Sequence, residues 1–276
     1  MTRPITISGY ASLTPPASPG PAPQLTWLPI EQLVIDESYQ RDITAQGRKN
    51  VRSIAENFSW TFFAPVIVSP IEGGRYAIID GQHRTTAAAL IGIKEVPCAL
   101  VIADKVVQAK AFRAINSQVT RPLKTQLFHA RLAAGDEVAV RAKTMCDAAG
   151  VTVPRWPGGW HNKKNATVAV DSITRMAMNH YRAGVVVLKC LLATSGANDA
   201  ACLRMTTIDA LFDVLVEAPQ WREDEAALIA AVEAMPMHEM LTNASAAAAR
   251  IKGTSARDQL AAMIIDALER ALRKAA

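Results

Sequence analysis

The sequence has no apolar segment of about 18 residues, so it contains no predicted membrane-spanning helix. Aromatic residues are also scarce, at 5% of the 276 positions, although half of the residues are hydrophobic. This combination predicts a soluble, alanine-rich and largely helical protein. No continuous apolar segment follows Arg3, as a signal peptide would require, so we expect the protein to stay in the cytoplasm.

Cysteine is scarce as well. The four cysteines, at positions 98, 146, 190 and 202, lie far apart, and none forms the C-x-x-C spacing that is typical of metal and redox sites. Three of them sit in apolar segments. We therefore interpret the cysteines as reduced residues of the core.

The length of the chain predicts two domains, or one domain with a large extension. Residues 1–24 are rich in proline and have little apolar surface to bury, which predicts a flexible arm. Short strands and helices alternate over residues 25–121, whereas residues 122–276 have helical patterns. The predicted fold class is α+β, with a small mixed-sheet domain followed by an α-helical region.

The helical region divides at residues that commonly break helices. Gly135, Gly150, Gly184 and Pro219 supply these breaks. The predicted helices cover residues 123–134, 136–149, 168–179, 183–193, 206–217, 223–235 and 255–274.

The sequence pattern of residues 65–101 predicts a hairpin that leads directly into a helix. Two β-branched runs flank a Gly73-Gly74 turn, and the second run ends in Asp-Gly-Gln-His-Arg at positions 80–84. The helix that follows ends at Gly92. Its start has free N–H groups and the positive end of the helix dipole, which favour an anion by about 0.3–1 kcal/mol. Gly81 lets the backbone approach that anion, and Arg84 can donate two hydrogen bonds to it.

This order of strand, DGQHR turn, alanine-rich helix and Val-Pro strand resembles the N-terminal domain of the ParB and sulfiredoxin superfamily over about residues 25–120. In that superfamily the matching turn holds nucleotide phosphates. The resemblance implies a nucleoside triphosphate, CTP or ATP with Mg, as ligand, and contacts from Arg41, Asp80, Gly81, Gln82, His83, Arg84, Thr85 and Thr86. Two alternatives stay open: Asp80 and His83 cap the helix while Arg84 pairs with Asp80, and Arg41 is an ordinary surface residue.

Relatives with this domain hold the metal through a Glu-Asn-x-x-Arg element, to which Asn116 and Arg121 correspond by resemblance. Ile115 stands where those relatives have glutamate, and Mg²⁺ normally takes one or two carboxylates, so a weak metal site is expected. Relatives also have a glycine-bearing loop where this chain has Trp60, Phe62 and Phe63. We interpret these aromatic residues as a hydrophobic plug, with base stacking as the alternative.

The basic residues concentrate in one segment. Twelve Lys and Arg against five Asp and Glu fall between positions 104 and 175. Within this segment, cations and flat rings occur together at Arg155, Trp156, Trp160, Lys163 and Lys164, a combination that suits nucleic-acid backbones and bases. In the alternative interpretation the tryptophans anchor the loop on the helices and the lysines are solvated.

Three functions compete. The first is a ParB-like protein that binds nucleotide and DNA in plasmid, phage or chromosome maintenance, without membrane contact and as a homodimer. The second is a small-molecule phosphotransferase similar to the ParB-like free serine kinase, with Glu31 or Asp36 as catalytic base. The third is a regulatory module with a vestigial site. Sulfiredoxin chemistry is not expected, because Gln82 stands at the position of the nucleophilic cysteine.

Overall fold

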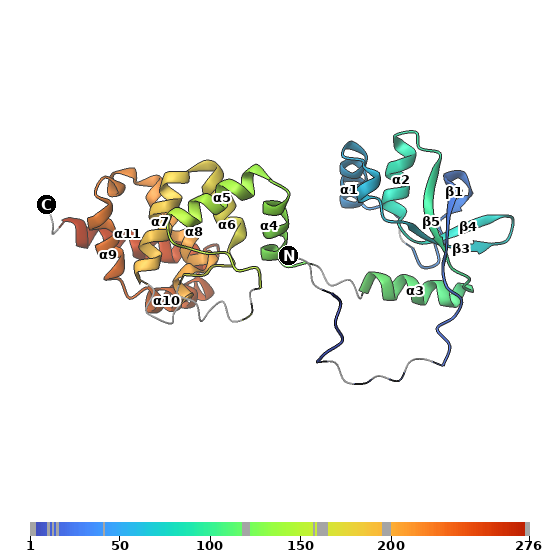
Figure 1. Ribbon diagram of the computed structural model, residues 1–276. Helices are drawn as coiled ribbons and strands as arrows, with labels where there is room; N and C mark the ends of the chain where they lie inside the picture. Colours follow the sequence, from blue (N-terminus) through green and yellow to red (C-terminus); the bar gives the residue numbers. More distant parts are fainter. Residues whose placement is uncertain are drawn as a thin grey trace. The chain divides into compact units, whose positions relative to one another are not determined.

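The computed structural model describes residues 4–9, 12, 14, 17–40, 42–117, 122–156, 158, 165–194 and 200–273. The chain divides into two compact units, Met1–Thr120 and Arg121–Ala276, and each has its own hydrophobic core (Figure 1). Within the described residues, no helix combines the length and apolar character needed to cross a membrane.

The N-terminal unit is built on a five-stranded sheet in the order β1-β5-β3-β4-β2. Its strands are β1 (Gln24–Pro29), β2 (Leu33–Val34), β3 (Val66–Ile71), β4 (Arg75–Asp80) and β5 (Glu95–Leu100). The pairs β1/β5 and β3/β4 are antiparallel, whereas β3/β5 and β2/β4 are parallel. This mixed sheet, followed by a helical unit, confirms the predicted α+β class, and β1 lies at one edge of the sheet.

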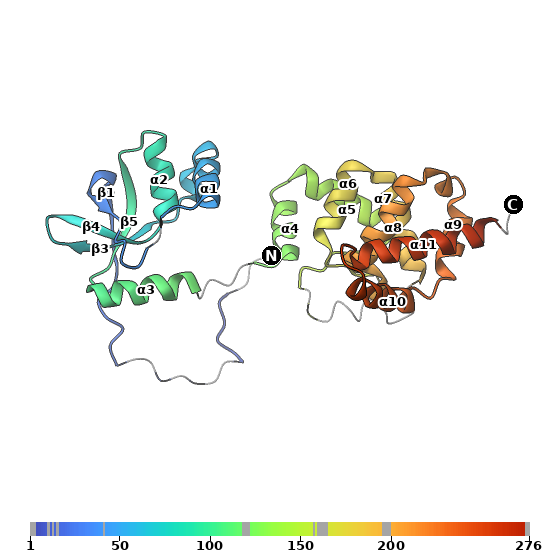
Figure 2. The same ribbon diagram turned by 180° about the vertical axis from the view of Figure 1, so that it is seen from behind.

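Three helices accompany the sheet: α1 (Ala45–Glu56), α2 (Gln82–Leu90) and α3 (Lys105–Ser117). α1 and α2 lie side by side, as both views show (Figures 1 and 2). The Asp104 carboxylate accepts the N–H of Val107 at 2.8 Å and caps α3. Gly92, with a φ of 83°, follows the end of α2 in the left-handed conformation expected of a C-terminal glycine.

The core of this unit places α2 on the sheet. Val66 and Val68 of β3 and Val96 and Cys98 of β5 are fully buried, as the two-residue period of a strand requires for side chains on one face. Ala88 of α2 packs into the same cluster. The N-terminus of α2 is therefore fixed at the end of β4 by packing that does not involve the DGQHR turn.

The predicted aromatic plug forms only in part. Phe63 is 8% exposed and belongs to the core, but Trp60 is 48% and Phe62 is 83% exposed. Trp60 packs edge-on against Trp27 and Phe58, with ring centroids 5.3 and 5.0 Å away. The backbone of residues 60–62 forms a single 3-10 turn, which directs Phe62 away from the core.

The C-terminal unit is helical, as predicted. Its helices are α4 (Lys124–Ala133), α5 (Glu137–Ala148), α6 (Val170–Asn179), α7 (Tyr181–Thr194), α8 (Met205–Glu217), α9 (Glu225–Glu233), α10 (Met237–Arg250) and α11 (Ala256–Arg273). Only α10 was missed by the sequence analysis. It is rich in small residues and buries only Met237 and Ala244, so its apolar pattern is weak. It packs along α11 (Figure 2).

The prediction that Gly184 breaks the helical region was wrong, because Gly184 lies inside α7. A Cβ at this position would stand 2.4 Å from the Sδ of Met145 and 3.1 Å from the Cβ of Met176. Gly184 is therefore retained for close packing of α7 on α5 and α6. Gly135 and Gly150 do follow helix ends, with φ values of 74° and 72°.

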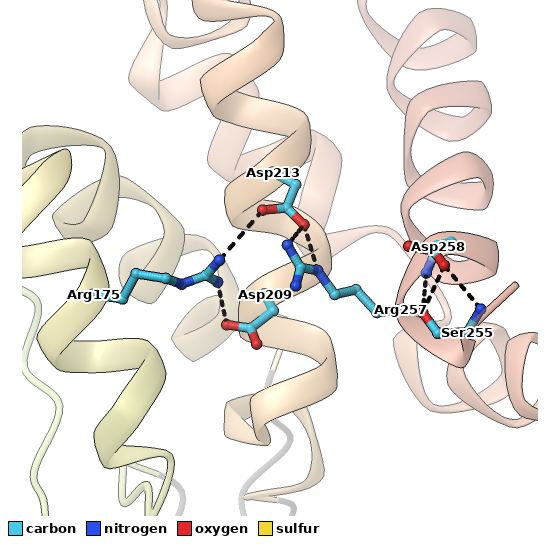
Figure 3. Close-up of polar contacts among 6 residues, drawn as sticks. All are labelled: Arg175, Asp209, Asp213, Ser255, Arg257 and Asp258. Carbon is cyan, nitrogen blue, oxygen red and sulfur yellow. Dashed lines mark hydrogen bonds and ion pairs between the residues drawn. The ribbon is translucent and has the colours of Figure 1, made fainter. Parts of the chain in front are cut away.

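A cluster of ion pairs joins α6, α8 and α11 (Figure 3). Arg175 of α6 contacts Asp209 at 2.7 Å and Asp213 at 3.9 Å, and Arg257 of α11 approaches Asp213 from the other side. At the start of α11, the Asp258 carboxylate accepts hydrogen bonds from the N–H and hydroxyl of Ser255, both at 2.8 Å. Asp213 thus bridges two arginines that come from helices on either side of α8.

All four cysteines are buried thiols outside any disulfide, in agreement with their interpretation as core residues. Burial raises the pKa of Cys98 to about 11 and those of Cys146 and Cys190 to about 12. These three thiols are therefore protonated at neutral pH and are poor nucleophiles.

Candidate phosphate-binding turn

The DGQHR turn joins the end of β4 to the start of α2. Gly81 is the N-cap of α2 and has a φ of 113°, a conformation that residues with a side chain rarely adopt. No side-chain hydrogen bond caps α2 within the described chain. The N–H of Thr85 already donates to the Gly81 carbonyl at 3.0 Å. The donors that α2 offers to an anion are therefore the N–H groups of Gln82, His83 and Arg84.

Arg84 folds back over the turn. Its Nη2 donates to Asp80 Oδ2 at 3.0 Å and to the carbonyl of Pro65 at 2.9 Å. Its Nε is buried and has no hydrogen-bond partner among the described residues. A Cβ on residue 81 would stand 3.0 Å from three atoms of this guanidinium, so glycine is needed here for space as well as for backbone conformation.

The structure therefore contains the Asp80–Arg84 ion pair of the alternative interpretation, but neither Asp80 nor His83 caps α2. The ion pair orients the guanidinium beside the uncapped helix start and leaves Nη1 as a donor, whereas the buried Nε is out of reach of solvent. This geometry suits an anion that approaches the turn from solvent.

His83 brings a second helix start to the turn. Its Nε2 would lie 2.8 Å from a Cβ on Gly47, which is buried in the first turn of α1. Thr44 caps α1 by accepting the N–H of Gly47 at 3.1 Å, and Arg48 follows directly. The starts of α1 and α2 are thus adjacent. The sequence analysis missed the roles of Thr44 and Gly47, although a Thr-x-x-Gly pattern ahead of an amphipathic helix indicates a capped and closely packed helix start.

The two threonines of the turn face the protein. The hydroxyl of Thr86 donates to the Gln82 carbonyl at 2.9 Å. Thr85 is 5% exposed, and its hydroxyl has no partner in the described part of the chain. The Thr86 hydroxyl and the Thr85 N–H are thus already engaged within α2, so these groups do not supply the phosphate contact predicted for the two threonines.

Residues 36–40 run alongside β4 and α3 close to the turn. The Gln40 amide donates to the Ile78 carbonyl, two residues before Asp80. The Tyr39 hydroxyl donates to Gln108 Oε1 of α3 at 3.3 Å. Arg41, the predicted second phosphate contact, lies outside the described residues. Gln40 and Pro65 were missed by the sequence analysis, because their contacts join segments that are distant in the sequence.

Neither of the two proposed catalytic bases is supported by the structure. Glu31 is exposed in a 3-10 turn ahead of β2, whose Leu33 pairs with Tyr76 near the start of β4. Tyr76 and Asp80 are about 13 Å apart along an extended strand. Asp36 accepts the N–H of Ser38 at 2.9 Å and pairs with Lys105 at 3.4 Å. The hydrogen bonds from Ser38, followed by Lys105, hold the pKa of Asp36 below its ordinary value, which makes this carboxylate a weaker base.

The metal contacts expected from resemblance are not assembled by the described residues. The exposed Asn116 donates its amide to the Phe112 carbonyl of its own helix at 2.8 Å, and Arg121 lies outside the described residues. Among the residues that the structure describes, no three His, Cys, Asp or Glu side chains form a group that could hold a metal ion.

Backbone hydrogen bonds join the two ends of the loop that is predicted to contact DNA. The Thr152 N–H donates to Asn165 at 2.8 Å, and the Thr167 N–H donates back to Thr152 at 2.9 Å. Arg155 is exposed and Trp156 is 67% exposed, so Trp156 is not anchored in the core. Trp160, Lys163 and Lys164 lie outside the described residues.

Residues 23–115 match the family model of the ParB N-terminal domain, which covers the sheet, α1, α2 and most of α3. Searching the curated proteins gave no significant match. Among solved structures, the chain is similar to C-terminally truncated ParB from Caulobacter crescentus complexed with CTP-γ-S, with 18% identity, 76% of this chain and 98% of that chain covered, and a TM-score of 0.34.

The same bacterial protein complexed to the centromeric parS site is 16% identical, with 86% and 97% of the two chains covered and a TM-score of 0.30. Sulfiredoxin from Arabidopsis thaliana is 19% identical, with 33% and 99% covered and a TM-score of 0.26.

Proposed function

We propose that this chain binds a nucleotide at the DGQHR turn and associates with DNA in plasmid, phage or chromosome maintenance. The match of residues 23–115 to the ParB N-terminal domain, which confirms the predicted ParB and sulfiredoxin superfamily, supports this proposal. The observation that carries the proposal is the start of α2. It combines free N–H groups, a glycine that admits a ligand, and a guanidinium held beside them by Asp80 and Pro65. Such an arrangement suits phosphate, which helix starts and arginine both bind well.

CTP is the first nucleotide to test, because a ParB similar to this chain was crystallised with CTP-γ-S. Gly81, Gln82, His83 and Arg84 would hold the phosphates. A metal would arrive with the nucleotide, since Asn116 brings one oxygen and Ile115 brings none.

The DNA contact is proposed for the helical unit. Its support is the basic excess at the start of this unit, where nine Lys and Arg stand against four Asp and Glu between positions 121 and 175, and the exposure of Arg155 and Trp156. The same proposal includes a homodimer of the chain. Binding measurements are needed to identify the DNA sequence that the protein prefers.

The phosphotransferase alternative has less support. Glu31 lies toward the far end of β4 from the turn, and the hydrogen bonds to Asp36 weaken it as a base. No carboxylate other than Asp80, which is paired with Arg84, is placed at the turn by a described contact.

Calorimetric titration of the full chain with CTP, ATP and GTP, each with and without Mg²⁺ and with a DNA duplex, tests the proposal. Binding of one triphosphate that strengthens with duplex is the expected result. Turnover of ATP that depends on a free amino acid would favour the phosphotransferase instead. Absence of binding to every nucleotide would leave the turn as a structural remnant.

A further inference from the structure

One edge of the sheet in the N-terminal unit is open. β1 forms this edge and pairs with β5 along its whole length. Sheets commonly protect their edges from further pairing by short edge strands, charged side chains, proline inside the strand or bulges. The opposite edge is protected, because β2 has only two residues. β1 has six residues without charge, its proline is the last residue, and its pairing with β5 has no register shift, so it lacks all these protections.

The backbone groups of β1 alternate between β5 and the open edge. Ile30, directly after β1, donates its N–H to the Lys94 carbonyl at 2.8 Å, which continues the register between β1 and β5. In an antiparallel pair every second residue makes such bonds, so the even-numbered residues of β1 bond to β5. The N–H and C=O groups of Leu25 and Trp27 therefore point to the open edge. Within the described chain, the one hydrogen bond to these groups is long, from the Thr26 hydroxyl to the Trp27 carbonyl at 3.4 Å.

The side chains beside this edge are apolar and exposed. Leu25 is 78% and Trp27 is 55% exposed, on the face of β1 opposite to the buried Leu28. Trp60 packs edge-on against Trp27 and is itself 48% exposed. Phe62, which is 83% exposed, belongs to the same 3-10 turn as Trp60. Apolar surface gathered in this way is typical of a protein interface.

We propose that this edge pairs with the same edge of a second copy, which joins the two sheets through antiparallel β1 strands. A two-fold axis at Thr26 sets Leu25 of each copy opposite Trp27 of the other. This register uses every N–H group that β1 points to the open edge, because Leu25 and Trp27 then both donate and accept across the axis. It also brings the Leu25 side chain of one copy beside the Trp27 indole of the other.

The charge of the chain favours contact between copies at this edge. The formal net charge is +5, which opposes contact between most surfaces of two copies. No charged residue occurs at positions 4–30, which include β1, or at positions 57–71, which include the 3-10 turn. Two copies therefore meet here without like charges facing each other.

The exposed surface is large enough for a reversible dimer. A whole aromatic side chain has about 150–250 Å², so the exposed parts of Trp27, Trp60 and Phe62 present roughly 300–450 Å² per copy. Leu25 and the strand backbone add to this area, which approaches the value of about 800 Å² per partner in standard interfaces. The proposal rests on the proposed function only in giving the homodimer its contact surface, and it requires no ligand at the DGQHR turn.

Proline at position 25 tests the hydrogen bonds across the axis. Leu25→Pro removes an N–H that points to the open edge and leaves the bonds between β1 and β5 in place, since edge strands tolerate proline at such positions. The two-fold axis doubles the loss, so the Kd of the dimer should rise about tenfold or more. Leu25→Val is the matched control, because valine is similar in size to proline and keeps the N–H. Sedimentation equilibrium of the full chain without nucleotide or DNA measures each Kd, and circular dichroism checks the fold.

A cysteine on the two-fold axis tests the register without weakening the edge. Thr26 would face Thr26 of the second copy in a pair without hydrogen bonds, where the Cα atoms are about 4.5 Å apart, a distance that a disulfide spans. The variant combines Thr26→Cys with Cys98→Ala, because Cys98 lies opposite Thr26 on β5 and would compete. Oxidised glutathione should convert this variant to a disulfide-linked dimer on a non-reducing gel. Gln24→Cys with Cys98→Ala is the control and should stay unlinked, since the two Gln24 residues would be about 14 Å apart.

The proposal is overturned if the dimer has the same Kd in the wild type and in Leu25→Pro, which would place the dimer contact on another surface. Equal disulfide formation by the Thr26 and Gln24 variants also overturns it. Nuclear Overhauser contacts between Trp27 and the exposed Ile5 or Ile7 of a monomer would assign the edge to the N-terminal segment of the same chain instead. A chain that stays monomeric at every concentration overturns both this proposal and the homodimer, but leaves nucleotide binding at the DGQHR turn unaffected.

Discussion

The guanidinium of Arg84 lies across Gly81, with three of its atoms 3.0 Å from the point where a Cβ on residue 81 would stand. The glycine therefore determines where the arginine lies, and the arginine in turn is fixed by Asp80 and Pro65. Within the DGQHR turn, Gly81 and Arg84 therefore depend on each other for their positions, and Asp80 at the end of β4 holds the arginine.

Replacing Gly81 by alanine tests this interlock. The φ of 113° is unfavourable for alanine, and strain of this kind costs about 1–3 kcal/mol. We expect Gly81→Ala to lower the free energy of unfolding of the N-terminal unit by that amount in urea titrations. Gly74→Ala is the matched control, because Gly74 also has positive φ but nothing lies within 4 Å of its added Cβ. Equal losses in both variants would mean that the contact with Arg84 contributes nothing.

Replacing Arg84 by alanine tests the phosphate contact. Loss of one charge-assisted hydrogen bond should weaken nucleotide binding by about 1.5–3 kcal/mol, measured by calorimetry with CTP and Mg²⁺. Arg52→Ala serves as control, since Arg52 is exposed on α1. An Arg84→Ala protein that is folded and binds CTP with the wild-type affinity would remove the proposed phosphate site.

Gly184→Ala should destabilise the C-terminal unit even though alanine is the better helix former. The new Cβ would stand 2.4 Å from Met145 Sδ, and overpacking in a well-packed core typically costs about 1–3 kcal/mol. Urea unfolding measures the loss. Repeating the substitution in a Met145→Ala background should reduce the loss, because the clashing atom is then gone. A stabilised Gly184→Ala protein would contradict the packing described for α7.

The bridging role of Asp213 predicts a stability loss that a surface ion pair does not produce. Asp213→Asn removes the charge shared by Arg175 and Arg257 and leaves the two guanidinium groups close together. We expect a decrease of about 1–2 kcal/mol in the free energy of unfolding, which salt diminishes. Asp266→Asn breaks the exposed pair with Arg270 and should change stability by less than about 0.5 kcal/mol. Similar effects of the two variants would show that the cluster is no more than a set of surface pairs.

The sequence predicted what depends on local chemistry. The Gly73-Gly74 hairpin and the end of α2 at Gly92 both follow from preferences of single residues. It could not predict that Gly184 is a packing residue, because this depends on Met145 and Met176 of other helices. Helix α10 escaped because its pattern of small residues gives little contrast between buried and exposed faces.

The candidate site shows the same division. The turn and its arginine were predicted from adjacent residues and from resemblance, whereas Pro65, Gln40 and Gly47 reach it only through the fold. Glu31 and Asp36 are the carboxylates that the sequence offers as the base of a phosphotransferase. The pairing of β2 with β4 places Glu31 away from the turn, and the carboxylate of Asp36 already accepts a hydrogen bond from Ser38.

The last prediction concerns the loop that begins at Arg155 and its proposed contact with DNA. If Arg155, Lys163 and Lys164 each neutralise one phosphate, replacing all three by glutamine should reduce the slope of log affinity against log salt by about 2.7, since each contact contributes about 0.9. The loss should be the same for duplexes of different sequence, because backbone contacts carry no base information. Fluorescence anisotropy at several salt concentrations measures the slope.

The control removes the same charge from elsewhere in the helical unit, through Arg182→Gln, Arg250→Gln and Lys252→Gln, all at exposed positions. A slope that falls equally in both triple variants would indicate a general effect of net charge. A wild-type slope in the loop variant would place the DNA contact on another surface. Trp156→Ala then separates the remaining possibilities: because Trp156 is 67% exposed, its removal should leave the melting temperature unchanged and weaken single-stranded DNA by about 1–3 kcal/mol if a base stacks on it.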